Sequence, residues 1–233
     1  MCASYGLQIT AADAHYAFNT LDERASTVAL EEWLGEFLDE PVKPTGVHAR
    51  NLNPIVRERR REIDGPDGPV SETRRTIDLA WWKLWVGGQP AKFPAINARV
   101  EGLIGSGAFG GPLKARRALV PATEYYEKGH RFRLDEKNGR DGLFAFAGLY
   151  NVNKTPEGEW MVSYAIVTQP AAPQIAAIHD RMPLILPPEL YDDWLDPTRV
   201  GDQELLDEAL AASRPLGQRL LASSTRSADH PLG

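Results

Sequence analysis

Prolines and glycines recur along the whole chain, and their spacing limits what the chain can fold into. The 233 residues include 18 Pro and 20 Gly. Both interrupt regular elements, Pro because it lacks a backbone N–H and Gly because it loses the most conformational freedom on folding. The sequence therefore predicts short elements joined by many turns, and it argues against a helical bundle.

Hydrophobic spacing indicates where those elements lie. A helix is expected over 11–40, because Leu30, Trp33, Leu34, Phe37 and Leu38 fall at helical spacing before Pro41 and Pro44. Residues 87–111 are expected to be mostly loop. Strands are expected at 54–63 and 70–80 around the turn 64–69, and at 116–120, 130–134, 143–150 and 160–168; helical segments are expected at 174–179, 188–195 and 203–212. Strands in the middle with helices at both ends predict an α+β fold with a mainly antiparallel sheet.

The charge distribution is uneven. The formal net charge of −6 disfavours nucleic acid as a partner, because phosphate neutralisation dominates most DNA affinity. Basic residues nevertheless gather at Arg50, Arg57, Arg59, Arg60 and Arg61, at Arg74 and Arg75, and at Lys114, Arg116 and Arg117, whereas acidic ones concentrate in 31–40 and 189–208. These stretches are either ordinary solvated charge or a local basic face on an acidic protein.

A single cysteine, Cys2, excludes an internal disulfide framework and the usual cysteine-based zinc sites. The five His are too dispersed to suggest a metal site, so we expect no metal and no cofactor. No apolar run approaches the roughly 18 residues of a membrane span, and the start lacks the features of a signal peptide. We expect a cytoplasmic protein with no membrane partner.

The position of Cys2 gives it distinctive chemistry. Removal of Met1 would leave a free cysteine at the chain start, with an α-amine and a thiol two carbons apart. The amine has an ordinary pKa of about 7.7–8.0, so part of it is neutral and nucleophilic near pH 7. An aldehyde would form an imine with this nitrogen, and the sulfur would then close a five-membered thiazolidine. The alternative is an inert, small hydrophobic cysteine.

Three further residues are candidates for proton transfer or positioning. His179 lies between Ile178 and the apolar run 184–186, where it is either a structural histidine or a general acid/base. Glu127 follows a strand and two tyrosines, where a carboxylate is most often solvated. Asn97 is expected in a loop, where Asn most often forms turns.

Taken together, these residues resemble a known family. The start Met1-Cys2 and the runs Asn97–Glu101, Tyr125–Glu127 and Ile178–Pro183 occur in the order and approximate spacing of the SOS-response-associated peptidase (SRAP) family, whose members are abasic-site processing proteins. Asn51–Pro54, Phe144–Leu149 and Ala165–Thr168 are weaker matches. The resemblance covers about residues 1–195 and implies one SRAP-like domain over 1–233 with a barrel-like core. The tail, about 215–233, is unassigned.

The resemblance implies a function and a site. Cys2 would trap the ring-opened aldehyde of an abasic site in single-stranded DNA, with slow reversal or lyase activity as further expectations. Asn97 would position the amine or sugar, and Glu127 and His179 would handle protons. Arg99 and Arg181 would bind phosphates, and Trp81 and Trp82 would contact DNA. The protein would act as a monomer that is nucleoid-associated when bound to DNA.

Some positions depart from the family, and other functions remain open. The usual Cys-Gly-Arg start is Cys2-Ala3-Ser4 here, the usual Trp-Gly segment reads Trp81-Trp82-Lys83, and Lys128 replaces an aromatic. One alternative is a thiol peptidase acting on its own N-terminus. Another is non-covalent single-stranded DNA binding through Trp81, Trp82 and Trp85, although such a cluster is more often core.

Overall fold

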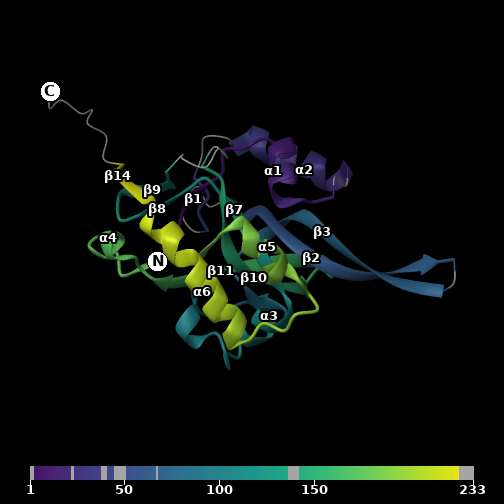
Figure 1. Cartoon of the computed structure of the whole chain (residues 1–233). Helices are drawn as coiled ribbons and strands as arrows, with labels where there is room; N and C mark the ends of the chain where they lie inside the picture. Colours follow the sequence, from purple (N-terminus) through teal and green to yellow (C-terminus); the bar gives the residue numbers. More distant parts are fainter. Residues whose placement is uncertain are drawn as a thin grey trace.

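The centre of the fold is a curled sheet built mainly from the middle of the chain, with helices on its outside (Figure 1). The computed structural model describes residues 3–21, 24–37, 41–44, 51–66, 68–135 and 142–225. Neighbouring strands in this part of the chain are mostly antiparallel, apart from the parallel pairings of β11 with β3 and β6. The predicted α+β class with a mainly antiparallel sheet is therefore confirmed.

The larger sheet closes on itself. Its strands, in spatial order, are β12 (Arg181–Pro183), β11 (Trp160–Pro170), β3 (Gly68–Trp82), β2 (Leu52–Gly65), β7 (Arg117–Ala122), β10 (Phe144–Lys154) and β13 (Ile185–Leu186), with β6 (Asn97–Arg99) paired to β11. Because β10 also pairs with β11, the path from β11 through β3, β2, β7 and β10 returns to β11. The core is thus barrel-like, although β6, β12 and β13 lie off this ring and it is not a strict barrel.

A smaller sheet lies at one end of the ring. Its order is β1 (Tyr5–Gly6), β8 (Glu124–Glu127), β9 (His130–Leu134) and β14 (Leu220–Ser224), and a separate short hairpin pairs β4 (Trp85–Val86) with β5 (Gln89–Pro90). Each of these strands, like β12 and β13, spans only two to five residues. They are too short for a periodic pattern, so only β9 was predicted.

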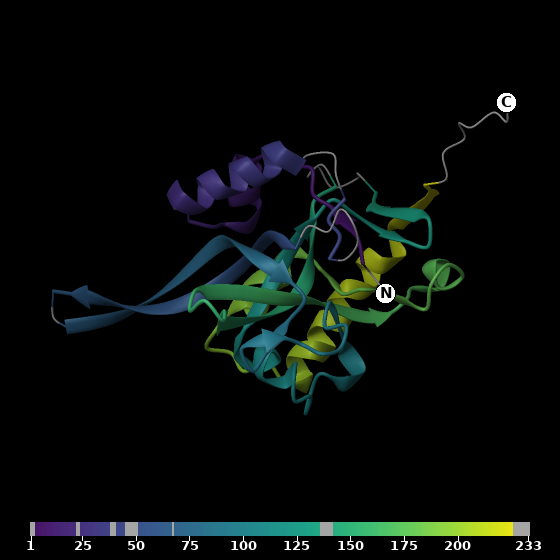
Figure 2. The same ribbon diagram turned by 180° about the vertical axis from the view of Figure 1, so that it is seen from behind.

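Helices cover the outside of the sheets (Figures 1 and 2). They are α1 (Ala11–Phe18), α2 (Arg24–Phe37), α3 (Gly110–Ala115), α4 (Pro173–Ala176), α5 (Tyr191–Leu195) and α6 (Gln203–Gln218), with 3-10 turns η1 (Val100–Gly102) and η3 (Pro188–Leu190). The single helix predicted over 11–40 is wrong. Asn19 adopts a left-handed conformation with φ 49°, which ends α1 and separates it from α2; Leu38 lies outside the described residues. No described helix is long and apolar enough to cross a membrane.

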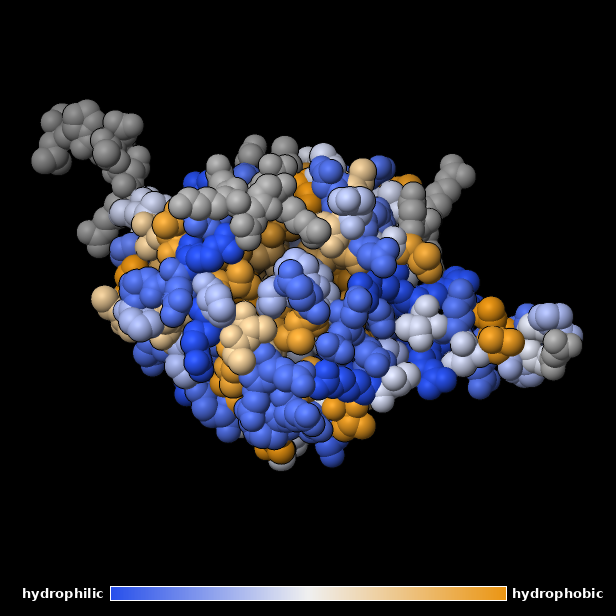
Figure 3. Space-filling model, viewed as in Figure 1, coloured by the Kyte–Doolittle hydropathy of each residue, from blue (hydrophilic) through white to orange (hydrophobic). Residues whose placement is uncertain are grey.

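Strands β2 and β3 extend beyond the ring as a two-stranded arm (Figures 1 and 2). They pair without interruption from Leu52↔Trp81 to Gly65↔Gly68, which confirms the predicted hairpin. The surface of the arm is mainly hydrophilic, as Figure 3 shows, with exposed Ile63 and Val70 near its tip. An arm of this composition lies in solvent because it has little apolar surface to bury.

Aromatic packing ties the start of the chain into the core. Trp82 is completely buried, stacks on Tyr164 with ring centroids 6.0 Å apart, and lies 5.1 Å from the ring of Tyr5. The hydroxyls of Tyr5 and Tyr164 share a hydrogen bond of 2.9 Å. Burying a side chain of this size contributes several kcal/mol, about 3–5 when it is deleted, so β1 is held firmly against β3 and β11.

Candidate active site

The start of the chain runs along strand β8. Tyr5 pairs with Tyr125 and Gly6 with Glu124, and the carbonyl of Ser4 accepts the N–H of Tyr126 at 2.9 Å. In this antiparallel register, each step toward the N-terminus is a step toward Glu127, the last residue of β8. Cys2, the predicted nucleophile, lies outside the described residues.

A tight turn fixes Glu127. It pairs with His130 across the hairpin of β8 and β9, and the two loop residues, Lys128 and Gly129, have φ of 47° and 74°. Positive φ at both central residues defines the type I′ turn that matches strand twist. Lys128 thus occupies a left-handed turn position. Glu127 is therefore anchored by the backbone of both strands.

His179 lies in the loop between α4 and β12 and faces Glu127. Its Nε2 is 3.9 Å from Oε1 of Glu127, and both side chains are largely buried, with exposed fractions of 14% and 13%. Its Nδ1 accepts the backbone N–H of Arg181 at 3.0 Å, so in the neutral ring the proton resides on Nε2, the nitrogen toward Glu127. The carboxylate of Asp180 lies 3.1 Å from Nδ1. The ring is thus placed to exchange a proton.

Asn97 and Arg99 belong to strand β6, whereas Asn97 was predicted in a loop. Asn97 is buried opposite Ile166 of β11, and Arg99 is exposed opposite Thr168. Because side chains alternate along a strand, residues 97 and 99 project from the same face of β6. The sequence did not indicate this strand, since three residues are too few for an alternating pattern.

Arg181 is engaged by a carboxylate. Its Nη1 donates to Oε1 of Glu101 at 2.5 Å and its Nη2 to Oε2 at 3.0 Å, while Nη2 also donates to the carbonyl of Thr168 at 2.7 Å. This hydrogen bond from Arg181 holds the pKa of the Glu101 carboxyl below its ordinary value. A phosphate would have to compete with Glu101 for Arg181. Glu101 belongs to the run Asn97–Glu101, but the sequence did not indicate that it contacts Arg181.

The tryptophans do not form an open stacking surface. Trp82 has no exposed surface, and its indole N–H donates to the carbonyl of Ile96 at 2.9 Å. The predicted DNA contact of Trp82 is therefore not available in this structure, because its ring faces are covered by Tyr5 and Tyr164. Trp81 is half-buried and Trp85 is largely buried. Residue type alone could not distinguish these environments.

Several arginines of the basic stretches have structural roles. Arg57 is buried and donates to Asp78 at 2.7 Å, and Arg75 donates to both Glu58 and Asp192. Arg117 is buried, and burial lowers its pKa; it donates to the carbonyls of Leu113, Lys114, Trp194, Asp196 and Arg199. These side chains join segments of the protein, so they do not add to a basic face; Arg50 lies outside the described residues.

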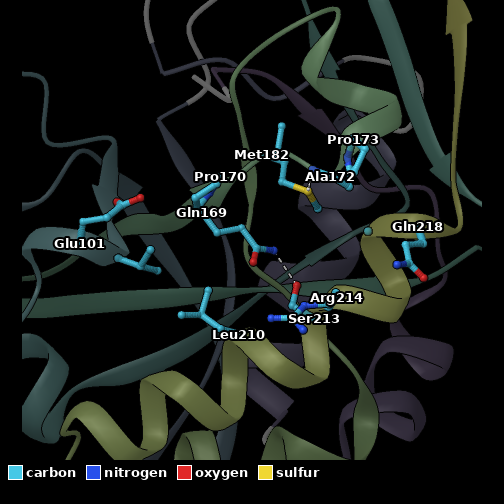
Figure 4. Close-up of a pocket in the computed structure, with 13 residues that line it drawn as sticks. Glu101, Gln169, Pro170, Ala172, Pro173, Met182, Leu210, Ser213, Arg214 and Gln218 are labelled. Atoms are coloured by element: carbon cyan, nitrogen blue, oxygen red, sulfur yellow. Dashed lines mark hydrogen bonds between the residues drawn. The ribbon is translucent and has the colours of Figure 1, made fainter.

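A cleft is lined in part by Glu101, the partner of Arg181 (Figure 4). It has a volume of about 560 Å³ and lies between the end of β11, β12 and α6. Within it, Nε2 of Gln169 donates to Oγ of Ser213 at 2.7 Å. Its lining includes Glu101, Gln169, Met182, Leu210, Ser213 and Arg214. No group of metal-binding side chains occurs among the described residues.

Comparison with known proteins identifies relatives of the chain. The family model described as SOS response associated peptidase (SRAP) matches residues 1–222. The abasic site processing protein YoqW of Bacillus subtilis (strain 168) is 37% identical over 129 residues, which cover 51% of this chain and 56% of YoqW. The abasic site processing protein HMCES of Gallus gallus is 25% identical over 205 residues, which cover 75% of this chain and 60% of HMCES. The matches thus span little more than half the length of these relatives.

The fold also occurs in solved structures. A crystal structure of a protein from Bordetella bronchiseptica has a TM-score of 0.65 and 20% identity, covering 97% of this chain and 100% of that chain. A crystal structure of a protein from Bacteroides thetaiotaomicron has a TM-score of 0.65 and 19% identity, covering 96% of this chain and 91% of that chain. At this identity, the likeness concerns the fold. The family model covers almost the whole sequence, and the chain therefore belongs to the SOS response associated peptidase (SRAP) family.

Proposed function

We propose that this chain processes abasic sites in single-stranded DNA by forming a covalent thiazolidine through Cys2 after removal of Met1. The observation that carries the proposal is the register of β1 on β8, which runs from Gly6 toward Glu127, with His179 3.9 Å from that carboxylate. The names of YoqW and HMCES describe processing of abasic sites and support the same substrate.

The chemistry needs a nucleophile and two proton-transfer groups. The Cys2 amine attacks C1′ of the open-chain sugar, water leaves to give an imine, and the thiol then adds to the same carbon. The product contains new C–N and C–S bonds, and the aldehyde oxygen departs as water. His179 Nε2 donates a proton to the sugar ring oxygen during ring opening, and Glu127 accepts a proton from the amine. Asn97 positions the amine or sugar.

Phosphate contacts hold the strand beside the lesion. Arg99 is exposed and contributes one guanidinium, and Arg181 contributes a second when it exchanges Glu101 for a phosphate. Trp81 is half-buried, so only part of its side chain is accessible to a base. In this proposal, DNA is held mainly by charge and less by base stacking.

A denaturing gel with single-stranded DNA bearing one abasic site tests the proposal. Wild-type protein should give a stable shifted band whose intact mass corresponds to the chain without Met1 plus DNA minus water. Cys2→Ala should lose the stable adduct but keep an imine that borohydride traps, because its amine remains free. A tag ahead of Cys2 should also abolish the adduct. An unchanged adduct yield in Cys2→Ala would refute the thiazolidine mechanism.

Active-site variants test the proton-transfer roles. Glu127→Gln and His179→Ala should each slow single-turnover adduct formation by about 10²–10⁴-fold. The Glu127→Gln defect should be larger at low pH, where the amine starts protonated and needs a base. If both variants form the adduct at the wild-type rate across about pH 5–9, the proton-transfer roles of Glu127 and His179 are wrong. Cleavage of a peptide reporter would favour a peptidase, and salt-sensitive binding with no adduct would favour a non-covalent binding module.

A further inference from the structure

The outer face of the smaller sheet carries a group that the proposed chemistry does not use. Side chains alternate along β8, so Tyr125 and Glu127 project from one face and Glu124 and Tyr126 from the other. Tyr125 stacks on Phe132 within the core. Glu124 and Tyr126 therefore lie on the opposite side of β8 from the candidate active site.

Glu124 is a buried carboxylate with three donors. Its side chain is 4% exposed, and its Oε2 accepts Nε of Arg131 at 2.5 Å and Nε of Arg133 at 2.9 Å. The hydroxyl of Tyr126 donates to Oε1. Burial opposes ionisation, but the hydrogen bonds from Tyr126 and Arg131 hold the pKa of Glu124 below its ordinary value. The carboxylate is therefore charged at neutral pH.

Strand β1 borders this group. Gly6 pairs with Glu124, and a Cβ on Gly6 would lie 2.8 Å from both Cγ and Oε1 of Glu124. The glutamate thus occupies the space that a side chain at position 6 would need. Its carboxylate holds Arg131 and Arg133 beside the strand that leads to the start of the chain.

The two arginines carry more positive charge than the carboxylate of Glu124 can neutralise. One carboxylate neutralises one guanidinium, so the group keeps a net positive charge. Each arginine reaches Glu124 through Nε, and the Nη groups of both have no hydrogen-bond partner among the described residues. Their side chains are 32% and 43% exposed. Two guanidinium groups that share one oxygen lie a few ångströms apart, a spacing that suits the oxygens of one phosphate.

We propose that Arg131 and Arg133 form a phosphate-binding pair that holds a DNA strand beside β1, with Glu124 as the residue that positions both. This rests on the proposed function, since the same DNA would reach the start of the chain. The pair differs from Arg57, Arg75 and Arg117, whose guanidinium groups join parts of the protein. It adds a binding surface on the face of β8 opposite Glu127.

Equilibrium binding of undamaged single-stranded DNA tests this pair. Fluorescence anisotropy would measure the dissociation constant at several salt concentrations for wild type, Arg131→Gln, Arg133→Gln and the double variant. Each single change should weaken binding roughly fivefold, which corresponds to about 1 kcal/mol for an exposed ionic contact. The double variant should reduce the log–log salt slope by about 0.7 for each phosphate that the protein no longer neutralises. Undamaged DNA has no aldehyde, so this result is independent of adduct formation.

Two further variants separate local binding from general charge. Arg199→Gln removes an equally charged arginine that is paired with Glu208 and precedes α6, and it should leave affinity unchanged. Glu124→Gln makes the protein less acidic but releases the pair, so affinity should fall if positioning matters. Wild-type affinity and slope in the double variant would overturn the proposal, as would no measurable binding by wild type at low salt. Tighter binding by Glu124→Gln would overturn the positioning role.

Discussion

Gly6→Ala should destabilise the protein through a single contact. The added Cβ would approach Cγ and Oε1 of Glu124 to 2.8 Å, closer than real Cβ contacts. A flexible glutamate would swing away, but this carboxylate is held by Tyr126, Arg131 and Arg133. Either β1 shifts or these bonds lengthen. Overpacking of this kind costs about 1–3 kcal/mol, so the melting temperature should fall by about 2–4 °C for each kcal/mol.

A double-mutant cycle isolates that contact. Chemical denaturation would give the unfolding free energies of wild type, Gly6→Ala, Glu124→Ala and the double variant. Removing the glutamate side chain should remove most of the Gly6→Ala penalty, a coupling of about 1–3 kcal/mol. Gly107→Ala is the matched control, because a Cβ there meets nothing within 4 Å. An equal Gly6→Ala cost in both backgrounds would refute the contact as its cause.

Three other perturbations have definite expected outcomes. Lys83 has φ 148°, a backbone conformation that favours glycine. Lys83→Gly should relieve about 1–3 kcal/mol of backbone strain, which exceeds the cost of about 0.5–1 kcal/mol for the added flexibility of the unfolded chain. A melting temperature, measured by calorimetry, that fails to rise would contradict this. Glu101→Gln should release Arg181 and tighten binding of undamaged single-stranded DNA roughly threefold at low salt; weaker binding would show that Glu101 instead orients Arg181 for phosphate. The pKa of Glu124 is lower in the folded protein than in the unfolded chain. Its contribution to stability is therefore complete above about pH 4.3 and is lost as pH falls through the folded pKa. Glu124→Gln should make the unfolding free energy depend less on pH in this acidic range, and an unchanged pH dependence would contradict this.

The fold could be predicted where local signals were strong. The β2–β3 hairpin followed from a dense turn signal between two runs of strand-forming residues, and the structure extends it to Leu52 and Trp82. The interruption at Asn19 was missed, because one residue in a left-handed conformation leaves little trace in hydrophobic spacing. Strands β1 and β6 pair with strands far along the chain, β8 and β11, so local sequence carries little trace of them.

The site could be predicted by residue but not by environment. Glu127 and His179 were chosen from their motifs, and the structure brings their side chains to 3.9 Å although 51 residues separate them in sequence. Trp82 and Arg117 have the residue types of a DNA contact, yet tertiary packing buries both. The role of Cys2 stays a prediction, because that residue lies outside the described part of the chain.

Strand β8 relates the chemistry to DNA binding in both proposals. One of its faces carries Glu127 toward His179, and the other carries Glu124 toward two arginines. Ser4 directly precedes β1, at the position where the family resemblance leads us to expect an arginine. In the second proposal, Arg131 and Arg133 on β9 supply positive charge beside this part of the chain. A shift of β8 would therefore disturb proton transfer and strand binding together, whereas loss of the arginines alone should weaken binding and leave the chemical step unchanged at saturating DNA.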